Sequence, residues 1–204
     1  MKVYFDVGAN NGSWGISKIH SEPDCVVYAF EPNPKFKAKL ESVANHYPNY
    51  KFYPYAVFNV STSITFNIAD GTDGSTDSGC SSILNFRKEM PSCWANRPDM
   101  IKTQEIVVDS ITMKDFCSEN NITRIDFFHC DVQGVDLQVL ESFEDLYNII
   151  QAGQIECATN PNVTIYENQT SNRETCTQWL LSHGFKINQI INEFCGECDL
   201  VFSK

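Results

Sequence analysis

The chain has 204 residues, of which 42% are hydrophobic and 20% are charged, and its formal net charge at pH 7 is −11. This composition is typical of one globular domain with a buried core, and it excludes a low-complexity, repeat or membrane-spanning class. The acidic balance argues against a nucleic-acid partner, because a negative surface repels phosphate backbones.

Apolar strands alternate with amphipathic helices in the first part of the chain. The pattern predicts a strand over 2–7, a turn over 8–12, a helix over 13–20, a strand over 25–30, a helix over 34–47, a strand over 50–58 and an alternating strand over 62–68. Lys35, Lys37 and Lys39 lie in the second helix, and we interpret them as a solvated face rather than a basic binding patch.

Residues 70–98 interrupt the alternation, since they are rich in Gly, Ser, Thr and Asp. A segment of this length predicts a functional loop or lid, or else a disordered insertion. Beyond it, the pattern predicts a strand over 104–108, a helix capped by Ser110 or Thr112 that ends near Asn120, a strand over 125–132, a helix over 135–147, a strand over 152–157, a helix over 175–183, and a terminal strand pair over 185–191 and 199–202.

This order predicts an α/β fold: a Rossmann-like, doubly wound, mostly parallel sheet with helices on both faces and an antiparallel C-terminal strand. We expect residues 1–204 to form a single domain. In such a sheet the ligand binds at the carboxyl ends of the strands, near the point where the strand order reverses.

Two sequence features fall at that edge. The turn Asp6-Val7-Gly8-Ala9-Asn10-Asn11-Gly12 lies between the first strand and the first helix, and its glycines permit close approach of a ligand. Glu31 ends the second strand, where an acid binds ribose hydroxyls in Rossmann-type sites. The turn is not G-x-G-x-x-G, and Asp6 suits a ligand with an ammonium group better than a pyrophosphate. Together the two features predict a nucleoside cofactor such as S-adenosylmethionine (SAM).

Three segments resemble those of FkbM-family methyltransferases: residues 6–12, Phe30-Glu31-Pro32-Asn33-Pro34, and the stretch from Ile125 to Gly134. The resemblance spans almost the whole chain. It departs from the family pattern at His129, where lysine is usual, and at Gln133, where glutamate is usual. The family often carries sequence before the first strand, so we expect the chain to be one domain of a longer protein.

The resemblance implies a class I SAM-dependent O-methyltransferase that acts on a sugar or glycan hydroxyl and releases S-adenosylhomocysteine (SAH). A deoxysugar such as rhamnose or fucose is an expected acceptor, and a glycosyltransferase is an expected fused or associated partner. The residues expected to bind the cofactor are Asp6, Gly8, Asn10, Asn11, Gly12, Glu31, Pro32, Ala56, Val57, Ser82 and Asp131, with Ser81 beside Ser82.

Three residues near the ends of the fourth and fifth strands are candidates for catalysis. A sugar hydroxyl is a poor nucleophile and needs a base or a metal. His129 and Asp131 are two apart on a strand and so share a face, and Glu156 ends the neighbouring strand. We expect Asp131 and His129 to act as a base and its partner. A divalent metal on Asp131 and Glu156 is the alternative that we do not favour.

The acceptor pocket is less well defined by sequence. Trp94, Arg97 and His183 are candidates for its lining, because aromatic faces suit sugar rings. Alternative functions are a non-catalytic binding module that keeps the fold, a methyltransferase for a non-sugar small molecule, and a nicotinamide-dependent oxidoreductase, which the missing G-x-G-x-x-G disfavours.

The nine cysteines do not indicate a disulfide scaffold in a chain of this length. Cys25, Cys130 and Cys157 lie in or beside apolar strands and are expected to be buried hydrophobic residues. Cys195 and Cys198 form a C-x-x-C pair without the second pair that a zinc site needs. The sequence starts with a strand rather than a signal peptide, so we expect a cytoplasmic location and no membrane span.

Overall fold

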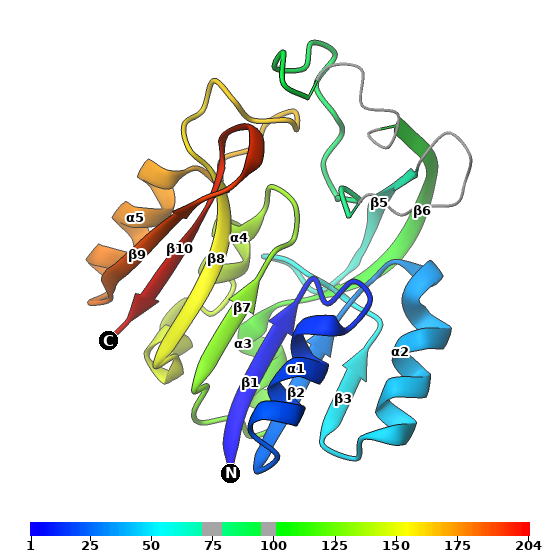
Figure 1. The fold of residues 1–204 in the computed structure, drawn as a ribbon, viewed down its shortest axis with the longest axis vertical. Coiled ribbons are helices and arrows are strands. Elements are labelled where there is room, and N and C mark those ends of the chain that lie inside the picture. The colour runs from blue at the N-terminus through cyan, green and yellow to red at the C-terminus, as the bar shows by residue number, and fades with distance from the viewer. Residues whose placement is uncertain (71–78, 95–100) are drawn as a thin grey trace.

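The computed structural model describes residues 1–70, 79–94 and 101–204. Its main element is a seven-stranded sheet in the order β3-β2-β1-β7-β8-β10-β9 (Figure 1). The strands are β1 (Lys2–Val7), β2 (Cys25–Phe30), β3 (Tyr50–Tyr53), β7 (Phe127–Cys130), β8 (Ala152–Ala158), β9 (Lys186–Asn192) and β10 (Glu197–Ser203).

The sheet is parallel from β3 to β8, and β10 then runs antiparallel to both β8 and β9. This confirms the predicted mostly parallel sheet with an antiparallel C-terminal strand. The strand order reverses at β1, which lies between β2 and β7, so the carboxyl ends of these three strands form the expected ligand-binding edge.

Helices cover both faces of the sheet, and in Figure 1 α1 lies in front of it and α3 behind it. Ile19 and Leu40 pack on one face, and Phe116, Leu140 and Leu180 on the other. The helices are α1 (Ser13–Ser21), α2 (Pro34–His46), α3 (Met113–Glu119), α4 (Asp136–Glu141) and α5 (Arg173–Ser182), with 3-10 segments η1 (Glu144–Ile149) and η2 (Phe194–Gly196).

A second sheet of three strands, in the order β4-β6-β5, lies beyond the carboxyl ends of the main sheet. It comprises β4 (Ala56–Val57), β5 (Ser63–Asp70) and β6 (Ile101–Ile111). The strand predicted over 50–58 is therefore wrong as one unit: it divides into β3 and β4, which belong to different sheets. Pro54 lies between them and cannot donate a ladder hydrogen bond.

The helix predicted over 135–147 is also divided. Glu144 has a φ of 48°, in the left-handed region, so α4 ends before it and η1 begins there. The Ser142 hydroxyl donates to the Val139 carbonyl at 2.6 Å and accepts from the Met113 amide at 3.1 Å. These bonds compete with the helix ladder at the break.

The predicted loop over 70–98 is described only at 79–94 and at Asp70, which ends β5. Within 79–94, Cys80 and Trp94 are buried and pack with Ile165 and Tyr166. This part of the loop is therefore held against the segment that follows β8. The helices described include none that is long and apolar enough to cross a membrane.

Candidate active site

The turn after β1 is built around Gly8. It has a φ of 84°, and an added Cβ would lie 1.9 Å from the Asp131 carbonyl oxygen. Only glycine fits there, because both the backbone conformation and the neighbouring chain exclude a side chain. The turn thereby brings the carboxyl ends of β1 and β7 together.

Glu31 follows β2 and faces the same turn. Its carboxylate accepts hydrogen bonds from the Asn10 amide at 2.7 Å and the Asn33 amide at 2.8 Å, and the residue is 7% exposed. The Asn33 side chain in turn accepts from the Lys35 amide and caps α2. The second strand, its terminal acid and the glycine turn are thus fixed as one unit.

A cavity of about 240 Å³ opens at this edge. Its polar side includes Gly8, Asn10, Glu31 and Asp131, and its apolar side includes Phe30, Phe36, Tyr55, Ala56 and Val57. Its described lining contains neither Lys nor Arg. The cavity therefore suits a flat apolar base, a ribose and a zwitterionic end, and it lacks the cations that favour a pyrophosphate.

Gln133 connects two of the predicted catalytic carboxylates. Its side-chain amide nitrogen donates to Asp131 Oδ1 at 2.7 Å and to Glu156 Oε2 at 2.9 Å. The Tyr166 hydroxyl lies 2.9 Å from Gln133 Oε1, and the Ser82 hydroxyl donates to the Gln133 carbonyl oxygen at 2.7 Å. Burial, followed by the Asp131 charge, raises the pKa of Glu156 well above its usual range.

His129 is bonded to Asp6 instead of Asp131. Nδ1 of His129 lies 2.9 Å from Oδ1 of Asp6, and the two residues are register partners on β7 and β1. The Trp14 ring stacks on the imidazole with centroids 4.6 Å apart and an angle of 9° between the planes. The expected partner of His129 was Asp131, which shares its face of the sheet. In the structure the hydrogen-bond partner is Asp6, because a residue on the neighbouring strand lies directly beside His129.

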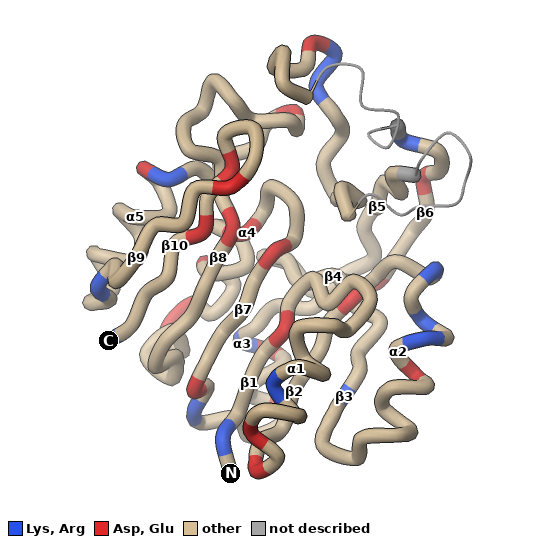
Figure 2. The backbone as a smooth tube through the Cα atoms, in the orientation of Figure 1, with Lys and Arg blue, Asp and Glu red and all other residues tan. Residues whose placement is uncertain are grey.

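A second cavity, of about 360 Å³, adjoins the first and shares Trp94, Asp131 and Glu197 with it. Its other lining residues are His129, Gln154, Glu156, Glu193, Phe194 and Asp199. Figure 2 shows the Asp and Glu positions gathered along β7, β8, β10 and the hairpin beside them. All three candidates for catalysis, His129, Asp131 and Glu156, therefore face one cavity.

Comparison with known proteins identifies the family. Residues 6–187 match the model of the methyltransferase FkbM domain. The chain belongs to the FkbM methyltransferase family. Membership confirms the prediction of a SAM-dependent methyltransferase.

A relative with a named activity is the 2-O-methyltransferase NoeI of Sinorhizobium fredii. It is 24% identical over 140 residues, which cover 68% of this chain and 56% of NoeI. The match thus spans little more than half of NoeI.

Solved structures share the fold at low sequence identity. A fibrillarin/Nop5p complex has a TM-score of 0.56 at 10% identity over 100% of this chain and 72% of the other. Aeropyrum pernix fibrillarin has a TM-score of 0.51 at 8% identity over 98% and 65%. M. capricolum TrmK has a TM-score of 0.51 at 11% identity over 100% and 62%. These matches confirm the Rossmann-like fold.

In this FkbM methyltransferase, the predicted cofactor residues divide into two groups. Gly8, Asn10, Glu31, Pro32, Ala56, Val57 and Asp131 line the first cavity. Asp6, Asn11, Gly12 and Ser82 do not line it. Asp6 is hydrogen-bonded to His129, and Gly12 is the N-cap residue of α1. The Ser82 hydroxyl donates to the Gln133 carbonyl oxygen, while its neighbour Ser81 lines the cavity.

The residues predicted to line the acceptor pocket do not all lie at the cavities. Trp94 lines both cavities and is 5% exposed. His183 lies instead at the end of α5, where it stacks on Trp179 with centroids 4.0 Å apart. Arg97 lies outside the described residues. Sequence reasoning missed Glu193, Phe194, Glu197 and Asp199, which reach the cavity because β10 pairs antiparallel with β8 and so brings the turn between β9 and β10 to this edge of the sheet.

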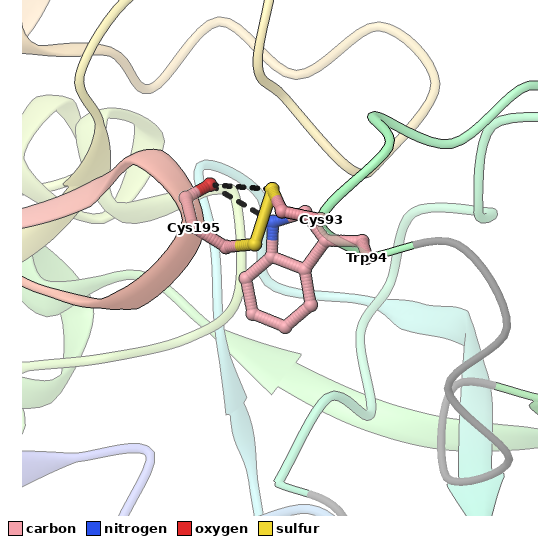
Figure 3. Close-up of a disulfide and its surroundings, with 3 residues drawn as sticks. All are labelled: Cys93, Trp94 and Cys195. Carbon is pink, nitrogen blue, oxygen red and sulfur yellow. Dashed lines mark hydrogen bonds between the residues drawn. A yellow bond between two sulfur atoms is a disulfide. The ribbon is translucent and has the colours of Figure 1, made fainter.

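The C-x-x-C pair does not act as a unit. Cys195 forms a disulfide with Cys93, their Cα atoms being 5.7 Å apart (Figure 3). Cys198 is instead buried, with its sulfur 3.7 Å from that of Cys157. The expectation of buried Cys25, Cys130 and Cys157 is confirmed. Among the described residues, no group of three or more His, Cys, Asp or Glu is arranged to hold a metal ion.

Proposed function

We propose that this chain is an O-methyltransferase that transfers the methyl group of SAM to a hydroxyl of a sugar or glycan. The observation that carries this proposal is the second cavity, which adjoins the cofactor cavity at Trp94 and Asp131. Carboxylates and the Gln154 amide accept hydrogen bonds from hydroxyl groups, and Trp94 and Phe194 supply aromatic faces for a sugar ring. The 2-O-methyltransferase activity in NoeI's name supports the same chemistry.

The acceptor in this proposal is neutral rather than phosphorylated. Glu193 and Asp199 lie beside Glu156 in the cavity, and its described lining has neither Lys nor Arg. A phosphate or uronate would be repelled from this surface. Neutral deoxysugars such as rhamnose and fucose therefore remain the acceptors that we propose.

Within the site, Glu31 binds the ribose hydroxyls of SAM, and the turn at Gly8 and Asn10 receives its methionine end. Ala56 and Val57 lie along the adenine ring. Asp131, His129 and Glu156 carry the chemistry at the acceptor. Burial, followed by the Asp131 charge, raises the pKa of Glu156 well above its usual range, which favours the neutral carboxylic acid there.

Two broader proposals concern the partner of the protein and the compartment in which it works. Residues 1–204 form one domain that works with a fused or associated glycosyltransferase, whose product it methylates. The disulfide of Cys93 and Cys195 favours an oxidising compartment over the cytoplasm, since such bonds persist in oxidising compartments. Thiol alkylation in intact cells, followed by mass spectrometry of Cys93, decides between the cytoplasm and an oxidising compartment.

Calorimetric titration with SAM and SAH tests the cofactor assignment. We expect micromolar binding to wild type, at least a tenfold loss in Glu31→Ala, and little change in the exposed control Glu41→Ala. Turnover to SAH is then measured with methyl rhamnoside, methyl fucoside and catechol. Binding without turnover on any acceptor favours the non-catalytic module, and turnover on catechol alone favours a non-sugar substrate.

A further inference from the structure

We propose that His129 is the general base that takes the proton of the acceptor hydroxyl, and that Asp6 is the residue that positions it. This inference rests on the proposed function, because it assigns a role within the same site. It replaces the pair expected from sequence, His129 with Asp131, by a pair that joins β7 to β1.

The hydrogen bond to Asp6 determines which nitrogen of His129 is available. Asp6 has 0% exposure, and its Oδ1 lies 2.9 Å from His129 Nδ1. A carboxylate only accepts, so Nδ1 carries the hydrogen and donates it. In the neutral imidazole the lone pair is then on Nε2, which makes no hydrogen bond to any residue that the structure describes.

The ring is also held in orientation. Trp14, from α1, stacks almost parallel on the imidazole ring. Trp14 itself contacts the Lys18 ammonium, which lies 5.0 Å from its ring centroid. With one edge bonded to Asp6 and one face covered by Trp14, the imidazole has little freedom to rotate. A general base held in this way loses little entropy when the acceptor binds.

The position of His129 fits proton removal at the methyl-transfer centre. It lines the second cavity, which shares Trp94 and Asp131 with the cofactor cavity. When bound, SAM would supply the methyl group: the acceptor oxygen would form a bond to the methyl carbon as the bond from that carbon to sulfur breaks, with SAH as the leaving group. The hydroxyl proton goes to Nε2 of His129, and the resulting imidazolium is stabilised by Asp6 until it returns the proton to water.

The groups around the imidazole affect its titration. Burial lowers the pKa of His129, but the hydrogen bond and charge of Asp6 on β1, with the charges of Asp131 directly after β7 and Asp199 on β10, raise it above its ordinary value. Gln154 on β8, the register partner of His129, is neutral and donates to Asp199 at 2.8 Å. The base form therefore accumulates at higher pH than it does for an ordinary histidine.

Modification by diethyl pyrocarbonate tests the pair without SAM or an acceptor, because the reagent attacks an unprotonated, accessible imidazole nitrogen. Mass spectrometry measures the rate at His129 against pH, with the exposed His46 as an internal control. We expect the His129 rate to rise through a midpoint above 6.5. In Asp6→Asn that midpoint falls, because the hydrogen bond and the charge of Asp6 raise the pKa of His129, while the rate profile of His46 is unchanged. An unreactive His129, or the same midpoint in both proteins, overturns the proposal.

Turnover supplies the second measurement, with the rhamnoside and fucoside as probes at saturating SAM. His129→Gln should lower the rate at least 100-fold while SAH affinity changes less than twofold. Asp6→Asn should shift the acidic limb of the pH–rate profile together with the modification midpoint. A wild-type rate in His129→Gln overturns the proposal, and this variant decides the question if Asp6→Asn does not fold. If wild type neither binds SAH nor methylates a sugar, the proposed function fails instead, and the modification profile alone decides whether the pair exists.

Discussion

The indole Nε1 of Trp94 donates a 3.0 Å hydrogen bond to the carbonyl oxygen of Cys195. Cys195 is joined by its disulfide to Cys93, the residue before Trp94, so two bonds fix the same point of contact (Figure 3). The Trp94 ring also meets Phe194 edge-on with centroids 5.7 Å apart. The wall between the two cavities is thus attached to the hairpin of β9 and β10.

We predict that breaking this disulfide destabilises the protein and weakens acceptor binding. Cys93 and Cys195 are 102 residues apart, and in the chain-entropy account the crosslink of so long a loop contributes about 5 kcal/mol. In Cys93→Ser/Cys195→Ser, thermal melting should shift down and the KM for the glycoside should rise. A reductant should reproduce both effects in wild type and have none in the double variant. An unchanged melting temperature in the variant would contradict the prediction.

Gln133→Glu, which restores the residue usual in the family, should destabilise this chain at neutral pH. The substitution removes the amide that donates to Asp131 and Glu156 and adds a carboxylate between them, at a cost of about 1–3 kcal/mol. Urea unfolding at pH 5 and pH 8 should show a larger loss at pH 8. Gln189→Glu on the exposed edge strand β9 is the matched control and should change stability by less than about 0.5 kcal/mol.

Gly8→Ala and Gly184→Ala separate backbone strain from steric exclusion. Both glycines have positive φ, 84° and 83°, but a Cβ at Gly8 would meet the Asp131 carbonyl oxygen at 1.9 Å, whereas one at Gly184 has nothing within 4 Å. Gly184→Ala should cost only the conformational strain, about 1–2 kcal/mol. Gly8→Ala should cost about 3–5 kcal/mol and abolish SAH binding. Similar unfolding free energies for the two variants would refute the close contact.

Asp136 should make the stability of the fold depend on pH. It is 1% exposed, and burial, then the Asp131 charge, raises its pKa to about 7. Between about pH 4 and pH 7 the carboxyl ionises in the unfolded chain but not in the native one, so stability is lost as pH rises. The stability of Asp136→Asn relative to wild type should therefore grow by about 3–4 kcal/mol from pH 4 to pH 8.

The sequence by itself determined the features that depend on short stretches of chain. The alternation of strands and helices, the turn at Gly8 and the acid at Glu31 each follow from local pattern and residue chemistry. Because parallel strands end at one edge of a sheet, these were enough to predict the fold class and the edge at which the first cavity opens. The divided elements at Pro54 and Glu144 were missed, since apolar spacing continues across both breaks.

Only the tertiary structure decided which distant groups meet. His129 and Asp6 are 123 residues apart, and they pair because β7 lies beside β1 in the sheet. Cys195 meets Cys93 instead of pairing with Cys198, and Gln133 bridges two carboxylates from the loop after β7 and from β8. Strand order, hairpin direction and loop path set these contacts, and none of them is encoded in the spacing of residues along a single element.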